Sequence, residues 1–492
     1  MKSDNSPTRN LPSAWVSLIP FVFLAAVLFA VIRIFGSSAL DGASQVSLLM
    51  ASGLVVAISM IFYKVSWEKL EEGILDNVRS VGSSIIILFL IGAVAGSWMV
   101  SGIVPMMIYY GMNIITPRIF LFACCLICAL ISVMTGSSWT TIATIGVALI
   151  GIGTAQGFSA GWTAGAIISG AYFGDKISPL SDTTTLASSS TVTPLFTHIR
   201  YMMKTTIPSF IIAAAVFLVV SLCHDSGTQV TAAEFAADLS GSFRITPWLM
   251  VTPLVTAFMI SKKIPAILTL FVATLMGVVT ALVFQPQIIW HIVTGLPVTG
   301  YSSLSFAQAF KGCMLSVYGP TSISVGNPEL DSLIATNGIT GMLPTVFLVM
   351  AASAFGGTLV GSGMLVSLTR LLQKGVRTTV GLVSSTVGTG IFCDMVTGDQ
   401  YLSIILAGSL YKELYREKGY ESRLLSRTIE DSATVCSVLI PWNSCGMTQA
   451  TILKVATVEY MPFCLFNIIS PLMSIIVAMI GWGIRKRSVT ER

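Results

Sequence analysis

The sequence predicts an all-α polytopic membrane protein built from two inverted-topology repeats of about five crossings each. Of its 492 residues, 54% are hydrophobic and only 10% are charged, which is far more apolar than a water-soluble protein tolerates. Apolar stretches of about 20 residues, the length that spans a bilayer, follow one another from Pro12 nearly to Arg485. Short motifs and the order of the segments also recur in the two halves of the chain.

The first half, residues 1–225, opens with two apolar spans. The stretch from Lys64 to Arg79 is amphipathic and charged, which predicts a helix lying on the cytoplasmic surface. Segment 82–115 is too long for one span and has small residues at its centre, which predicts either two short spans or, as we expect, one re-entrant hairpin surrounded by protein or water. Two long segments interrupted by Thr-Gly and by a proline motif predict broken helices at 118–153 and 158–196.

The second half repeats this order of elements. We expect an extracytoplasmic linker at 226–246 and a C-terminal repeat at 247–492, with a hairpin at 341–372 and broken helices at 379–412 and 428–456. Three matches keep nearly one offset: Gly96–Gly102 with Gly357–Gly363 at 261, Thr135-Gly136 with Thr397-Gly398 at 262, and Asp175 near Asp431 at 256.

An odd number of crossings in each half requires the second half to be inverted relative to the first. With both termini in the cytoplasm, most Lys and Arg residues face inward, including the basic connection from Lys412 to Arg427. The cluster Arg370, Lys374 and Arg377 is the exception. Inverted repeats with broken helices are typical of secondary transporters, whose sites lie near the bilayer midplane.

Composition argues against other classes. The apolar stretches leave no gap large enough for a soluble catalytic domain, and the basic residues lie in short connections rather than on a nucleic-acid-binding face. The nine cysteines lie mostly in apolar segments and are interpreted as small packing residues. Three histidines, all near predicted span ends, favour neither a metalloenzyme nor a Ser/His or Cys/His nucleophile. We expect no enzyme, no cofactor and no nucleic-acid partner.

The segment Gly174–Ser190 carries Asp175, Lys176 and Asp182 beside Pro179 in an otherwise apolar region. A carboxylate at mid-bilayer costs about 2.5 to 3.5 kcal/mol even on insertion scales, so such groups usually line an ion path. Pro179 should break the helix and bring the two carboxylates to one cavity, where a proton and Na⁺ compete. The alternative is an Asp175–Lys176 pair that only fixes helix packing.

Hydroxyl, amide and carboxylate oxygens gather at the four predicted breaks, and such hard ligands suit Na⁺ better than zinc or copper. Na⁺ is expected at Asp175, Asp182 and Asp399. The full candidate set is Asp175, Ser178, Ser181, Asp182, Thr183, Thr135, Ser137, Ser138, Asp394, Thr397, Asp399 and Asn443.

The second-half carboxylates have competing interpretations. Asp399 lies within its break and is a stronger candidate than Asp394, but it could equally cap the helix that starts at Gln400. Glu430 and Asp431 follow two arginines, which favours an interfacial salt bridge slightly over a role in transport.

The motif Gly174–Thr184 closely resembles the signature of the NhaC-type sodium/proton antiporters. The sequences Thr397–Ser403 and Pro441–Gly446 are similar to that family's second-half motifs, and the resemblance extends from about Trp15 to Trp482. It implies a fold of paired hairpins and broken helices in the broader ion-transporter superfamily. It also implies Na⁺/H⁺ exchange across a prokaryotic plasma membrane, with lipid as surroundings and a homodimer left open.

Two competing functions remain. One branch of the family is described as exchanging malate with protons for lactate with sodium, and the Thr-rich run after Asp182 would suit small carboxylates as readily as a cation. A channel or an intramembrane enzyme is disfavoured, because broken inverted repeats point to carriers.

Overall fold

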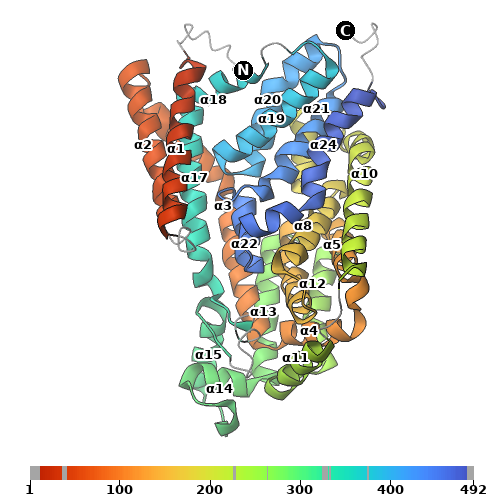
Figure 1. Ribbon diagram of the computed structural model, residues 1–492. Helices are drawn as coiled ribbons and strands as arrows, with labels where there is room; N and C mark the ends of the chain where they lie inside the picture. Colours follow the sequence, from red (N-terminus) through yellow and green to blue (C-terminus); the bar gives the residue numbers. More distant parts are fainter. Residues whose placement is uncertain are drawn as a thin grey trace.

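The computed structural model describes residues 11–35, 42–224, 229–262, 264–323, 331, 334–373 and 376–484. Within these ranges nine helices are long and apolar enough to cross a membrane, or up to eleven if each of two bent pairs is one span. The predicted all-α polytopic fold is therefore confirmed. The terminal segments lie outside the described residues, but α1 begins and α24 ends at the same end of the molecule (Figure 1).

The helices of the first half are α1 Ala14–Phe35, α2 Ala43–Tyr63, α3 Trp67–Val100, α4 Ile103–Ile114, α5 Phe120–Thr135, α6 Ser138–Thr141, the π-helix η3 Ile142–Gly146, α7 Val147–Ala155, α8 Ala160–Ile177, α9 Asp182–Ser190 and α10 Leu195–Leu222. Those that follow are α11 Gln229–Ser242, α12 Val251–Ser261, α13 Ala266–Phe284, α14 Pro286–Thr294, α15 Phe306–Tyr318, α17 Leu343–Ser362, α18 Met364–Gln373, α19 Thr379–Thr397, α20 Gln400–Glu417, α21 Ser422–Ile429, the π-helix η7 Glu430–Thr434, the 3₁₀ turn η8 Ser437–Leu439, α22 Ser444–Leu453, α23 Thr457–Tyr460 and α24 Leu465–Ile480.

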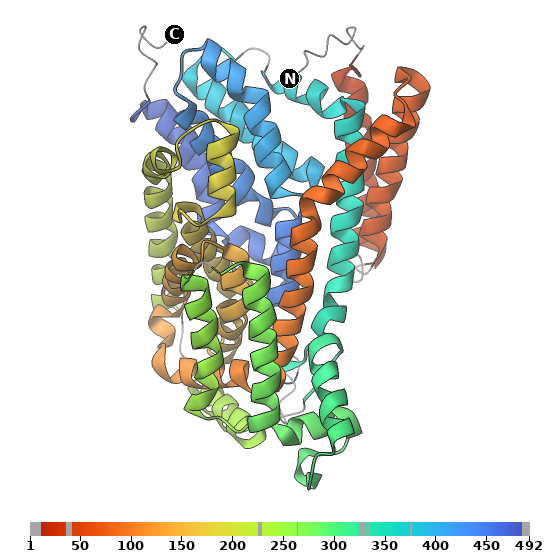
Figure 2. The ribbon, with the colours of Figure 1, turned by 180° about the vertical axis from the view of Figure 1, so that it is seen from behind.

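The segment predicted as a hairpin at 82–115 has a different structure. Helix α3 is continuous from Trp67 to Val100, and its 34 residues extend about 51 Å, more than the thickness of a bilayer core. The predicted surface helix and the predicted first arm are therefore one helix, seen as the long orange helix in Figure 2. The chain turns at Gly102, where φ is 77°, and continues as α4 at the lower end of the molecule (Figure 1).

Segment 341–372 is likewise one long helix, α17, followed by a turn at Gly363 and the short helix α18. The small residues that suggested breaks allow close packing instead. A Cβ on Gly357 would lie 2.5 Å from the carbonyl oxygen of Gly73, and a Cβ on Gly96 would lie 2.2 Å from that of Ser316. Glycine is needed where α17 crosses α3 and where α3 packs against α15, so these small residues mark tertiary contacts rather than helix ends.

Helical hairpins occur instead at the segments predicted as the first broken helix of each half. Helices α19 and α20 pack side by side in the upper part of the molecule, joined at Gly398 (Figure 1). In the first half, α7 packs against α4, and a Cβ on Gly153 near the end of α7 would lie 3.0 Å from the ring of Phe120 at the start of α5, so the chain returns to the side from which it came. The remaining breaks, at Ser178–Ser181 and Ile440–Asn443, separate α8 from α9 and η8 from α22.

Close packing of α5 against α8 positions the end of α8. Gly170 and Gly174 are spaced as in a GxxxG motif, and a Cβ on either would come within 2.3 Å of a carbonyl oxygen of α5. The Ser132 hydroxyl of α5 donates to the carbonyl of Ala171 at 2.6 Å. The buried Cys124, Cys125 and Cys128 lie in the apolar core that includes this contact. This packing alone fixes the position of the C-terminal turn of α8, which carries Asp175.

Candidate functional site

A cavity of about 430 Å³ lies where three parts of the chain meet: the tip of the α5–α7 hairpin, the break between α8 and α9, and the start of α20. Its wall also includes parts of α3 and the connection from α12 to α13. The polar residues that line it are Ser83, Ser84, Thr135, Ser137, Thr140, Asp175, Asp182, Thr183, Gln400 and Tyr401. Both halves of the chain therefore contribute polar groups to one space.

Ser138 donates two hydrogen bonds to Asp175. Its carboxylate oxygen Oδ2 accepts the Ser138 backbone N–H at 3.1 Å and the Ser138 hydroxyl at 2.7 Å. Ser138 is the first residue of α6, and a helix N-terminus stabilises a negative charge. Asp175 is only 6% exposed, and that exposure faces the cavity.

The alternative prediction of an Asp175–Lys176 ion pair is wrong. Lys176 is fully buried, and its ammonium donates to Asp431 and, at 2.9 Å, to the Ser470 hydroxyl. Neighbouring residues on a helix point in different directions, so Asp175 faces the first-half hairpin while Lys176 faces the second half. An ion pair between residues 255 apart in sequence thus joins the two halves.

The polar residues at the break after α8 have two kinds of role. Some line the cavity, and others stabilise the backbone of the break. Asp182 is the first residue of α9 and is exposed to the cavity. Ser181 caps α9 by accepting the Thr184 N–H at 3.3 Å, and its hydroxyl lies 3.0 Å from that of Thr183. Ser178 donates to the carbonyl of Val133 at 2.8 Å and does not line the cavity.

The second-half candidates form a separate buried cluster outside the cavity wall. Asp399 caps α20 by accepting the Leu402 N–H at 2.9 Å, and the Ser444 hydroxyl donates to it at 3.4 Å. The Asn443 side chain donates to the backbone carbonyl of Asp394 at 3.1 Å. The Asp394 carboxylate is fully buried, and neither of its oxygens accepts a hydrogen bond in the described structure. The structure therefore shows that Asp399 caps α20, which is one of the two roles predicted for it.

The two hairpin breaks, Thr135–Ser138 and Thr397–Gln400, have the same local structure. In each, the threonine hydroxyl accepts the N–H two residues later, at 3.2 Å in both. The glycines have φ values of 67° and 65°. The next residue caps the following helix, accepting the N–H three residues on at 3.2 Å and 2.9 Å. This agreement at an offset of 262 supports the internal repeat that the sequence predicts.

Sequence reasoning missed several residues and misplaced others. Gln400 and Tyr401 line the cavity but were not candidates. For Glu430 and Asp431 the predicted interfacial position is wrong, because both residues have 0% exposure, while the predicted salt bridge exists between Asp431 and Arg427 at 3.8 Å. The position of the two acidic residues in a π-helix, a feature frequent at functional sites, could not be seen from residue types.

Buried charge within the described residues is unbalanced. Five carboxylates have less than 9% exposure, namely Asp175, Asp394, Asp399, Glu430 and Asp431. Two cationic side chains, Lys176 and Arg427, are buried to the same degree. If all seven were ionised, the core would carry an excess of three negative charges. Isolated buried charge is too costly to persist, so protons or bound cations must make up the difference.

A polytopic helical protein with a carboxylate-lined cavity between paired helix breaks is, by class, a secondary transporter. The chain belongs to the Na⁺/H⁺ antiporter family, whose family model matches residues 170–482. It is 34% identical to the Na⁺/H⁺ antiporter NhaC of Bacillus subtilis over 88% of this chain and 91% of that protein.

Two further relatives have other names. The chain is 31% identical to a malate-2H⁺/Na⁺-lactate antiporter of Bacillus subtilis, with 96% of each chain covered. It is 30% identical to the arginine/ornithine antiporter ArcD of Halobacterium salinarum, over 99% of this chain and 96% of that one. These relatives are antiporters rather than enzymes.

Proposed function

We propose that this protein exchanges Na⁺ for H⁺ across a prokaryotic plasma membrane. The observation that carries the proposal is a cavity lined by the carboxylates of Asp175 and Asp182 and by polar groups of both halves, within a core whose described buried carboxylates outnumber its buried cations. Such an excess requires positive charge from the solution, and a carboxylate accepts either a proton or Na⁺. Competition of the two cations for one set of oxygens is sufficient for exchange.

Asp175 and Asp182 are the leading ligands for the transported Na⁺. Both line the cavity, and the Ser138 donors occupy only one oxygen of Asp175. The other oxygen can receive a cation. The Thr183 hydroxyl supplies a further hard oxygen on the same wall. Protonation of the carboxylates would then release Na⁺.

Alternating access would come from movement of one part of each repeat against the other. The matching hairpin breaks at an offset of 262 and the ion pair between Lys176 and Asp431 support two related halves that meet at the site. We further propose the inverted arrangement of these halves, with both chain termini in the cytoplasm.

A Na⁺-coupled exchanger of small organic acids is the second candidate. It is favoured by the relative named for malate and lactate, which aligns over nearly the whole chain, and by the hydroxyl and amide groups in the cavity wall. The cavity volume of about 430 Å³ is large enough for a small carboxylate as well as for an ion.

Ion flux in proteoliposomes separates the two functions. We expect an imposed pH gradient to dissipate when Na⁺ is added in the absence of any organic acid, with Li⁺ and K⁺ as the cation comparisons. The same vesicles, preloaded with malate or lactate, test organic-acid exchange. Flux of Na⁺ that requires malate would contradict the first function and support the second.

A further inference from the structure

Glu430 is a buried carboxylate that the proposed exchange does not use. It starts the π-helix η7 and has 0% exposure. Its Oε1 oxygen accepts the Thr183 hydroxyl at 3.3 Å, while Oε2 makes no hydrogen bond. The Thr434 hydroxyl lies one turn further along η7 and is also buried without a hydrogen bond among the described residues. Buried polar groups normally have a hydrogen-bond partner, so these two oxygen atoms indicate a place where a further group binds.

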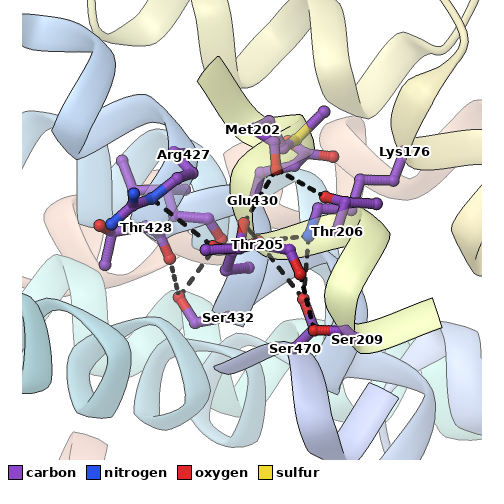
Figure 3. Close-up of polar contacts among 12 residues, drawn as sticks. Lys176, Met202, Thr205, Thr206, Ser209, Arg427, Thr428, Glu430, Ser432 and Ser470 are labelled. Atoms are coloured by element: carbon purple, nitrogen blue, oxygen red, sulfur yellow. Dashed lines mark hydrogen bonds and ion pairs between the residues drawn. The ribbon is translucent and has the colours of Figure 1, made fainter. Parts of the chain in front are cut away.

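The neighbouring acid, Asp431, is paired with two cationic side chains, although its Oδ2 oxygen accepts no hydrogen bond among the described residues. It receives the Lys176 ammonium, the Thr205 hydroxyl at 3.1 Å and the Ser470 hydroxyl at 3.3 Å. The Arg427 guanidinium also lies 3.8 Å from its second oxygen. Figure 3 shows these hydroxyl and cationic side chains converging from α8, α10, α21 and α24. Among the described residues, Glu430 accepts one hydrogen bond and forms no ion pair, so the two adjacent carboxylates differ in the cations that face them.

The charged groups around and including Glu430 have a net charge that one monovalent cation would balance. Lys176 and Asp175 act on it from α8, Asp431 follows it in the same turn of η7, and Arg427 lies about one turn earlier on α21. Three carboxylates against two cationic groups leave one negative charge. The Lys176 ammonium is bonded to Asp431 and forms no ion pair with Glu430 among the described residues.

The groups available are one carboxylate and two hydroxyls, all hard oxygen donors. One negative charge is too little for Ca²⁺ or Mg²⁺ sites, which draw on several carboxylates or phosphates. Thr183 connects this place to the cavity wall, and its hydroxyl can turn its proton toward Ser181, 3.0 Å away, leaving a lone pair for a metal ion. The donor set therefore suits a monovalent metal cation.

We propose that Glu430, Thr434 and Thr183 form a second site for one Na⁺ ion, set between the cavity and the buried Lys176–Asp431 pair. The second site rests on the proposed function, because it is an additional binding site for the same transported ion. It would carry Na⁺ from the first-half ligands to the second half, across the contact between α9 and η7.

Na⁺-dependent thermal stabilisation of the purified full-length protein tests the site. NaCl is titrated against choline chloride at constant ionic strength, and the unfolding midpoint is recorded for the wild type, Glu430→Gln and Thr434→Val. Losing the charged ligand should raise the half-saturating Na⁺ concentration of Glu430→Gln about 10-fold or more, and Thr434→Val should show a smaller shift. Ser432→Ala is the matched control, because the Ser432 hydroxyl donates to the backbone carbonyl of Thr428 at 2.7 Å.

The outcomes separate this site from the proposed function. A wild type without a Na⁺ response, or an unchanged response in both variants, overturns the site even if vesicles exchange Na⁺ for H⁺. Because Glu430→Gln removes a charge that has no ion-pair partner, it should fold without Na⁺ at least as well as the wild type. Failure to fold would show a structural role and also overturn the site. Vesicles that exchange no Na⁺ for H⁺, with the shift in Glu430→Gln present, would overturn the function alone.

Discussion

Replacing Asp175 by asparagine is expected to abolish Na⁺-driven proton movement. The amide oxygen can still accept from Ser138, so the end of α8 should keep its position while the negative charge is lost. Removing one preorganised electrostatic contact of this kind lowers rates by about 100-fold or more. Dissipation of a pH gradient in vesicles on addition of Na⁺ measures the effect.

Ser138→Ala is the matched control for this substitution. It removes the 2.7 Å hydroxyl bond but keeps the backbone N–H and the carboxylate charge. The expected loss is about 10-fold or less, the scale of one hydrogen bond to a charged group. Wild-type exchange in Asp175→Asn would refute the role of this carboxylate as the shared ligand for Na⁺ and H⁺.

Asp431→Asn should be the most destabilising of the conservative substitutions in the core. It leaves the buried Lys176 ammonium and Arg427 guanidinium without their ion-pair partner. Breaking a buried pair by removing one partner costs about 3–5 kcal/mol. Unfolding in mixed micelles titrated with SDS gives the change in the free energy of unfolding, and the double variant Lys176→Gln with Asp431→Asn should recover part of the loss.

Asp76→Asn provides the comparison on the surface. Asp76 pairs with Arg79 at 2.8 Å, but these side chains are 63% and 76% exposed. Exposed pairs contribute about 0–1 kcal/mol, so little change in the free energy of unfolding is expected. Equal effects of Asp431→Asn and Asp76→Asn would contradict the view that the Lys176–Asp431 pair joins the two halves.

Local chemistry in the sequence predicted the breaks at Thr135–Ser138 and Thr397–Gln400, because Thr-Gly followed by a capping residue ends one helix and starts another. The same chemistry placed Asp175 and Asp182 beside a proline break, and the structure brings both to one cavity. What each break becomes depends on contacts far along the chain. A broken helix and a helical hairpin have the same local signal, and only packing against α4 or within the α19–α20 pair decides between them.

The glycines of α3 and α17 show why the hairpins were misplaced. Gly96 and Gly357 looked like helix breakers, but each meets a carbonyl from a distant segment. Lys176 shows the same limit for charge, since its partner is neither Asp175 nor any residue nearby in sequence. Glu430 looked interfacial because it follows Arg427, yet both are buried together in the core.

The central claim is that buried carboxylates hold protons which Na⁺ displaces. Proton release by the purified protein in weakly buffered detergent solution tests it most directly. Addition of Na⁺ should acidify the solution in a saturable manner, whereas an equal addition of choline should not, and Asp175→Asn should release fewer protons. Na⁺ binding that stabilises the protein without releasing any protons would contradict the account.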